Sequence, residues 1–250
     1  VTRQVRYSND SGNELDLAIF INGLPVLTFE LKNSLTKQTL ADAIVQYQTT
    51  RSPQELLFQL GRCVAHVAVD DAEAAFCTEL KGMASWFLPF NQGWNSGAGN
   101  PPNPDGLKTD YLWKQVLTRE SLANIIESYA QVVEEEEADA SGKKRKKRKQ
   151  IFPRFHQLRT VRALLRRAHD DGVGKRYLIQ HSAGSGKSNT IAWLAHQLVE
   201  LRRKGDPDGS TPPAQFDSII VITDRLALDT QITRTIKGYD HVAAIFGHSD

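Results

Sequence analysis

The sequence is poor in the features that mark secreted, zinc-bound and membrane proteins. Cysteine occurs only at Cys63 and Cys77, and no C-x-x-C motif or metal-ligand spacing of histidines is present. This pattern argues against a disulfide scaffold or a structural zinc site and favours a reducing, cytoplasmic setting. No apolar run approaches the roughly 20 residues of a membrane span, and no signal-peptide pattern is found, so we expect no membrane partner.

The chain also has no strong net charge of either sign. Lys and Arg number 31 against 29 for Asp and Glu, so the net charge is +2 and any nucleic-acid surface must be local. Apolar residues make up 40% of the 250, enough for a core in one large domain or two ordinary ones. Because the chain begins with Val1 rather than Met, we expect both ends to be cut out of a longer protein.

Hydrophobic periodicity predicts a chain of the α/β class. Two apolar runs around the Asn22-Gly23 turn signal predict a β-hairpin over residues 15–32. Further strands are expected at 64–69, 177–180 and 218–223, and helices at 37–50, 119–133, 156–169 and from the Gly/Ser loop to about 203. The strand, helix, strand order after residue 177 predicts the start of a parallel sheet.

Two charged runs divide the chain. Residues 134–137 are four consecutive glutamates, and residues 143–149 are seven consecutive cations. Neither run has an apolar face, so we expect a solvated linker at 134–150 between domains at 1–133 and 151–250. The basic run could bind DNA phosphates, but a tether balanced by the preceding acids is the favoured interpretation.

Residues 181–188, His-Ser-Ala-Gly-Ser-Gly-Lys-Ser, are the strongest motif and match the Walker A pattern with His181 at the first glycine position. Small residues let backbone N–H groups face phosphate oxygens, and the following helix adds its positive N-terminus. Lys187 is expected to reach the β- and γ-phosphates, and Ser188 to complete Mg²⁺ coordination. A Gly-rich turn with an exposed lysine is the alternative.

A second candidate site consists of Asp16, thirteen intervening residues, Glu30, one residue and Lys32. Two carboxylates can hold the metal that phosphodiester hydrolysis needs, and the lysine can assist the attacking water. Asp16 faces Glu30 only if the hairpin loop has an odd length, as in a three-residue loop at 22–24, or if a strand carries a bulge. An ordinary solvent-exposed face with an ion pair is the alternative.

These residues resemble a known family. The span 22–33 closely resembles the nuclease core of type I restriction endonuclease motor (R) subunits, a PD-(D/E)xK fold, and 183–188 is similar to motif I of superfamily 2 helicases and translocases. A nuclease followed by such a motor is that subunit's arrangement, and segments within 71–117 also look like it. The resemblance implies a restriction-endonuclease-like nuclease core followed by the first part of a RecA-like P-loop motor domain.

The resemblance also implies roles for single residues. In the family, the segment 152–157 reads adenine through Gln157, and 223–225 belong to motif Ia against the DNA backbone. The residues implied to hold ATP·Mg²⁺ are Gln157, Ala183, Gly184, Ser185, Gly186, Lys187 and Ser188. Asp16 and Glu30 are implied to hold the nuclease metal, with Lys32 assisting. The residues implied to contact DNA are Thr223, Arg225 and Tyr47.

Tyr47 carries the weakest of these assignments. Many R subunits have Gln-x-x-x-Tyr on the helix after the nuclease core, but Ala43 occupies the Gln position here, and Gln46 is a candidate substitute. A core-facing aromatic residue on an amphipathic helix is an equally good interpretation of Tyr47.

The resemblance implies DNA cleavage and ATP-dependent translocation on double-stranded DNA, with ATP and Mg²⁺ as cofactors and methylation and specificity subunits as partners. The acidic pair that follows motif Ia in such motors is not reached before Asp250, so we do not expect this chain to hydrolyse ATP alone. Two alternatives stay open: a nuclease–helicase of DNA repair, and a DNA-binding, ATP-gated module with an inactive nuclease.

Overall fold

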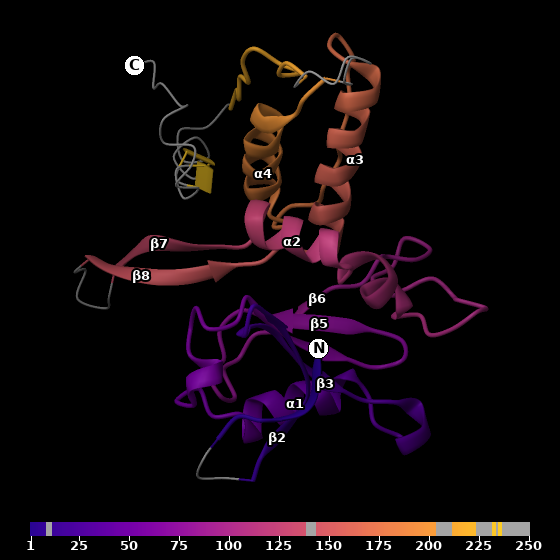
Figure 1. Ribbon diagram of the computed structural model, residues 1–250, viewed down its shortest axis with the longest axis vertical. Helices are drawn as coiled ribbons and strands as arrows, with labels where there is room; N and C mark the ends of the chain where they lie inside the picture. The colour runs from indigo at the N-terminus through magenta and orange to yellow at the C-terminus, as the bar shows by residue number, and fades with distance from the viewer. Residues whose placement is uncertain (9–11, 139–143, 204–211, 224–231, 234, 237–250) are drawn as a thin grey trace. The chain divides into compact units, whose positions relative to one another are not determined.

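The computed structural model describes residues 1–8, 12–138, 144–203, 212–223, 232–233 and 235–236 (Figure 1). The chain forms two compact units, Val1–Phe155 and His156–Asp250. Among the described residues, none of the helices combines the length and hydrophobicity that a membrane crossing requires.

The first unit is built on one mixed sheet, which confirms the predicted α/β class. Its strands are β1 (Thr2–Arg6), β2 (Glu14–Ile21), β3 (Leu24–Leu31), β4 (Ala65–Val69), β5 (Ala74–Cys77) and β6 (Leu88–Pro89), which lie side by side in chain order. Only β3 and β4 are parallel; the other neighbouring pairs are antiparallel. A parallel pair needs a crossover connection, and α1 (Leu40–Thr50) lies in that connection.

Helix α1 packs its apolar face on the sheet. Asp42 accepts a hydrogen bond from the Thr39 backbone N–H at 2.7 Å, which satisfies one polar group at the start of the helix. Ala43 and Tyr47, four residues apart, are fully buried on the same face. They join a core cluster with Leu15, Phe58, Ala68, Cys77 and Leu80.

Short helical turns and a second helix complete the first unit. The turns are η1 (Ser34–Thr36), η2 (Leu56–Phe58) and η3 (Leu112–Val116), the last with π-helical geometry, and the helix is α2 (Arg119–Ser128). The Thr118 side chain caps α2 by accepting from the Ser121 N–H. The helix expected at 119–133 is therefore confirmed over its first ten residues.

The β2–β3 hairpin has a two-residue turn and a bulge. Asn22 and Gly23 have φ angles of 50° and 81°, a conformation that Asn-Gly adopts at low cost, so of the two expected alternatives, an odd-length loop or a bulge, the loop is not the one formed. Ile21 pairs with Leu24 beside the turn, but further along Ile19 pairs with Leu27. One extra residue of β3 is accommodated between these pairs, which confirms the expected bulge.

The two charged runs form an antiparallel ribbon, a pairing that composition did not predict, and residues 145–149 are exposed to solvent as expected. Strand β7 (Gln131–Ala138) pairs with β8 (Lys144–Ile151), so that Glu134–Glu137 lie opposite Arg145–Arg148. Opposite charges across a strand pair stabilise it, and Glu134 forms an ion pair with Lys146 at 3.2 Å. The ribbon is anchored at its base, where the buried Gln150 side chain donates to the Cys63 carbonyl at 2.6 Å.

The described part of the second unit contains two long helices. These are α3 (Phe155–Asp171) and α4 (Lys187–Glu200), as the sequence predicts. The strands expected at 177–180 and 218–223 are not formed, so the predicted parallel sheet is wrong for the described residues. Leu178 and Ile222 are 96% and 89% exposed, because neither segment pairs with a strand within the part of the chain that the structure describes.

Candidate active site

The bulge in the hairpin brings the two predicted carboxylates to one place. Beyond the bulge, Leu17 pairs with Phe29, and the next position in this register sets Asp16 opposite Glu30. The charge of Asp16 also raises the pKa of Glu30, as expected for carboxylates at facing positions of neighbouring strands. Without the bulge the two-residue turn would direct them to opposite faces of the sheet.

Glu30 is a fully buried carboxylate with one occupied oxygen. Its Oε1 lies 2.6 Å from Arg51 Nε, and its Oε2 has no hydrogen-bond partner among the described residues. Burial raises the pKa of Glu30 from 4.5 to about 7, and Arg51 opposes this rise. A buried carboxylate oxygen without a partner is costly unless a proton or cation satisfies it.

This donor set fits Mg²⁺. Mg²⁺ commonly binds through one or two carboxylates and keeps the remaining positions for water and substrate phosphates. In the described part of the chain, no cluster of three or more His, Cys, Asp or Glu side chains could hold a metal. The Asp16–Glu30 pair can therefore supply part of a coordination sphere, not a closed structural site.

Arg51 is the site residue that sequence reasoning missed. It follows the last residue of α1 and is 5% exposed. Besides Glu30, its guanidinium donates to Tyr7 Oη at 3.0 Å and to the Glu14 carbonyl at 2.9 Å. The available signal was its position directly after α1, four residues beyond Tyr47, where a buried arginine without a partner would be costly.

Asp16 and Lys32 are each held in place by one hydrogen bond. Asp16 Oδ2 accepts from the Leu31 backbone N–H at 2.7 Å, which directs this carboxylate toward β3. Lys32 Nζ donates to Gln46 Oε1 on α1. Gln46, the candidate substitute for the glutamine missing at position 43, thus contacts the predicted catalytic lysine.

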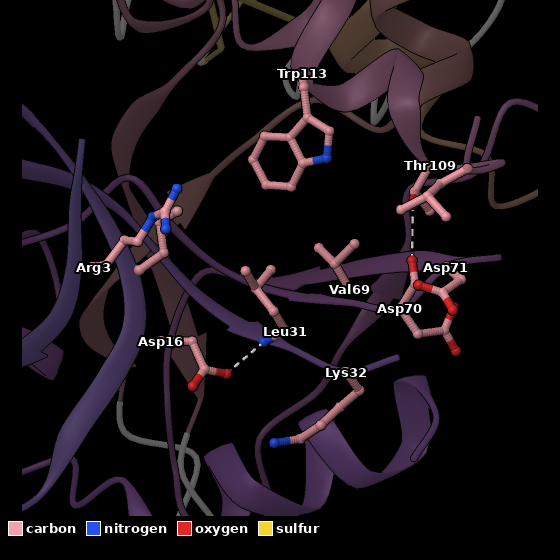
Figure 2. Close-up of a pocket in the computed structure, with 11 residues that line it drawn as sticks. Arg3, Asp16, Leu31, Lys32, Val69, Asp70, Asp71, Thr109 and Trp113 are labelled. Atoms are coloured by element: carbon pink, nitrogen blue, oxygen red, sulfur yellow. Dashed lines mark hydrogen bonds between the residues drawn. The ribbon is translucent and has the colours of Figure 1, made fainter. Parts of the chain in front are cut away.

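A cavity of about 480 Å³ lies beside these residues (Figure 2). Asp16 and Lys32 line it, whereas Glu30 is buried next to Asp16. Its other lining residues are Arg3, Leu17, Leu31, Val69, Asp70, Asp71, Leu107, Thr109 and Trp113. The cavity thus offers access to one of the two carboxylates and to the lysine.

Tyr47 lies in the core, which corrects the expectation that it contacts DNA. Its side chain is fully buried, and its hydroxyl is hydrogen-bonded to Thr28 Oγ1 at 2.9 Å. Thr28 Oγ1 is also 2.7 Å from His66 Nδ1, and burial lowers the pKa of His66 to about 3, so the ring is neutral. The core-facing interpretation of Tyr47 is the one that the structure supports.

The phosphate loop has the backbone that its sequence predicts. Gly184 and Gly186 have φ angles of 71° and 81°, and α4 begins immediately afterwards at Lys187. Lys187 Nζ donates to the Ser182 carbonyl at 2.9 Å, within the loop itself. The loop is thus curled at the N-terminus of a helix, the arrangement in which backbone N–H groups bind phosphate.

Gln157 lies against this loop. It is 3% exposed, and its Nε2 donates to the Gly186 carbonyl at 2.9 Å. A Cβ atom on Gly186 would come within 2.5 Å of Gln157 Nε2, so the contact depends on a glycine. The structure therefore brings together Gln157 and the loop, while its role toward adenine stays a prediction.

The last predicted contacts lie at the edge of the described chain. Thr223 belongs to a stretch without regular structure, and Arg225 lies outside the described residues. Their assignment to DNA binding stays a prediction.

Two families match separate parts of the chain. Residues 1–84 match the family described as the N terminus of type I restriction enzyme R proteins, and residues 156–245 match the SWI2/SNF2 ATPase family. The first match contains Asp16, Glu30 and Lys32, and the second contains Gln157 and the phosphate loop. No solved structure matches the chain significantly.

Curated relatives match over most of the chain. The endonuclease subunit of type I restriction enzyme MjaIXP from Methanocaldococcus jannaschii is 21% identical over 270 aligned positions, which cover 98% of this chain and 22% of that protein. The type I restriction enzyme HindI endonuclease subunit from Haemophilus influenzae is 25% identical over 224 positions, covering 89% of this chain and 19% of that protein. The chain therefore spans about a fifth of the length of these relatives.

Proposed function

Since the chain is related to the R subunits of type I restriction enzymes, we propose that its first unit is a Mg²⁺-dependent DNA endonuclease. The observation that carries the proposal is the bulged register, which sets Asp16 opposite Glu30 beside Lys32. The mixed sheet with these residues on adjacent strands supports a PD-(D/E)xK nuclease core, assigned to residues 1–133. The names of the relatives support the same activity, since both are called endonuclease subunits.

In this proposal Asp16 and Glu30 Oε2 hold the metal. Bound Mg²⁺ supplies Lewis acidity toward the phosphodiester and lowers the pKa of a coordinated water. Arg51 occupies Glu30 Oε1, so that Oε2 is the oxygen left for the ion. Lys32 assists the attacking water from the cavity wall, and its hydrogen bond to Gln46 sets the position of its ammonium group.

The second unit contributes to an ATP-driven motor. We assign residues 151–250 to the first part of a RecA-like translocase domain, with Gln157 reading adenine and Lys187 and Ser188 holding ATP·Mg²⁺. The loop at the start of α4 and the match to SWI2/SNF2 ATPases support this assignment. In the whole protein the motor would move double-stranded DNA, working with methylation and specificity subunits.

The test of the nuclease proposal is Mn²⁺ binding followed by EPR without nucleotide. We compare the chain with Asp16→Ala and Glu30→Ala, and with Asp71→Ala as a matched control. Asp71 is a carboxylate of the same cavity, but Ser34 occupies its Oδ2 through two hydrogen bonds. Loss of one Mn²⁺ site in the first two variants but not in the control is the expected result.

The opposite result would remove the catalytic assignments. If neither carboxylate substitution changes Mn²⁺ binding, the first unit is not a metal-dependent nuclease, and a DNA-binding module with an inactive nuclease becomes the better interpretation. Circular dichroism of each variant shows that loss of metal does not come from unfolding.

A further inference from the structure

One wall of the cavity is not used by the proposed cleavage chemistry. Asp16 and Lys32 lie on one side, and the ring of Trp113 lies on the other, with Leu31 and Val69 between them (Figure 2). Metal-dependent hydrolysis of a phosphodiester needs the carboxylates and the lysine, but it does not need an aromatic ring. The apolar wall is therefore available to contact another part of the substrate.

Trp113 is held firmly and yet is accessible. It lies on the π-helical turn η3 and is 37% exposed. Its ring packs on Phe29 of β3 with a centroid distance of 5.5 Å and an interplanar angle of 46°. Helices with π-helical turns are often found at functional sites, and this one supplies an indole to the cavity wall.

The cavity carries charges of both signs, with Asp16 and Lys32 on one side. Asp70 and Asp71 line the cavity, but their oxygens accept hydrogen bonds from the protein: Asp70 from Leu40, Ala72 and Glu73 N–H groups, and Asp71 from Ser34. Arg3 and Lys32 supply positive charge to the same cavity. A phosphate at Asp16 and Lys32 would share this cavity with the Trp113 ring and the apolar side chains of Leu31 and Val69.

We infer that this cavity binds a single nucleobase, unstacked from its neighbours and placed on the Trp113 ring, while the adjoining phosphate lies at Asp16 and Lys32. The inference rests on the proposed nuclease function and names the substrate form: a locally unpaired or distorted nucleotide. A base inside an intact duplex cannot reach a cavity wall, so it must leave the stack. The volume of about 480 Å³ is within the range of small-ligand sites and accommodates one base.

The test compares two DNA probes in EDTA, so that no metal is bound and no strand is cut. One probe is a short duplex with a single unpaired nucleotide, and the other is the fully paired duplex of the same sequence. Affinity is measured by fluorescence anisotropy for the chain, for Trp113→Leu and for Trp113→Phe. Leu preserves apolar packing on Phe29 without a stacking face, whereas Phe retains that face.

We expect the chain to prefer the probe with the unpaired nucleotide. Trp113→Leu should lower the affinity for this probe roughly 5- to 150-fold, the range expected for the loss of one base–aromatic stack, and should abolish the preference. Trp113→Phe should retain most of both. Trp86→Leu is the matched control, since Trp86 is 76% exposed and does not line the cavity, and it should bind both probes like the unaltered chain.

Two results would overturn the inference: equal affinity of the unaltered chain for both probes, or an unchanged preference in Trp113→Leu. Mn²⁺ binding by the same variants separates this failure from failure of the proposed function. If the Asp16 and Glu30 substitutions leave Mn²⁺ binding intact while Trp113→Leu loses the preference, the base site stands and the metal assignment falls. If Mn²⁺ binding depends on the carboxylates and Trp113→Leu does not change the preference for the unpaired probe, the metal assignment stands and the base site falls.

Discussion

Replacing Arg51 by Ala should destabilise the first unit by an amount that depends on pH. The side chains of Arg51 and Glu30 are 4% and 0% exposed, and the substitution leaves a buried carboxylate without its cation. Breaking such a buried pair costs about 3–5 kcal/mol. The Tyr7 hydroxyl and the Glu14 carbonyl also lose a donor, but Tyr7 is only partly buried and Glu14 is exposed, so water can replace it at little cost.

The cost should be smaller in acid. Arg51 lowers the pKa of Glu30, so without Arg51 this pKa rises above its value of about 7 and the buried carboxyl takes up a proton. At pH 8 the unfolded chain has an ionised Glu30, so keeping this carboxyl protonated in the folded variant costs free energy of unfolding. Near pH 5 a buried, protonated Glu30 costs much less. We therefore expect a loss of about 3–5 kcal/mol at pH 8 and roughly 1–2 kcal/mol less at pH 5.

The assay is urea unfolding followed by tryptophan fluorescence in a Trp193→Phe background. The remaining tryptophans, Trp86, Trp94 and Trp113, then all report on the first unit. In a Glu30→Gln background Arg51→Ala should cost less and should lose its pH dependence. Two outcomes would refute the role of the buried pair. One is a loss of unfolding free energy below about 1 kcal/mol at pH 8, and the other is an equal loss at both pH values and in both backgrounds.

Three further predictions concern single contacts. Glu30→Gln should flatten the pH dependence of unfolding of the first unit: the folded pKa of Glu30 is raised from 4.5 to about 7, so the native chain loses stability as pH rises through this window and the variant does not. Gly186→Ala should weaken ATP binding about tenfold in a titration with a fluorescent ATP analogue, since its φ of 81° strains any residue with a Cβ and the Gln157 amide, 2.5 Å from that Cβ, must move away from the loop. Tyr47→Phe should lower the unfolding free energy by about 1–3 kcal/mol, because the Thr28 hydroxyl loses a buried partner, and should leave DNA affinity in an anisotropy titration unchanged.

The hairpin shows how far local sequence reasoning reaches. Alternating apolar residues and Asn22-Gly23 are enough to predict two strands and a turn, because these preferences act over a few residues. The facing of Asp16 and Glu30 depends on the position of one bulge, and the sequence alone allowed either a longer loop or a bulge. The turn residues chose the short loop, and the pairing of β3 with strands on both sides set where the extra residue lies.

The pairing of the charged runs was not predicted, and the C-terminal strands were predicted wrongly, for the same reason. Composition indicates that 134–150 has no apolar face, but it does not show that acids and bases will meet in register across a ribbon. Propensity likewise favours strands at 177–180 and 218–223, yet a strand requires a neighbour for its backbone groups. Pairing between distant segments is a property of the folded chain.

The sequence by itself determined the phosphate loop, since its glycines and the helix that follows them act within eight residues. It also determined the candidate metal ligands as residue types. Only the tertiary structure decided that Arg51, 21 residues from Glu30, occupies one carboxylate oxygen, that Tyr47 faces the core, and that Trp113 lines the cavity of Asp16. These contacts join segments far apart in the chain, and burial, which is settled by the packing of the whole unit, decides which polar groups must find partners.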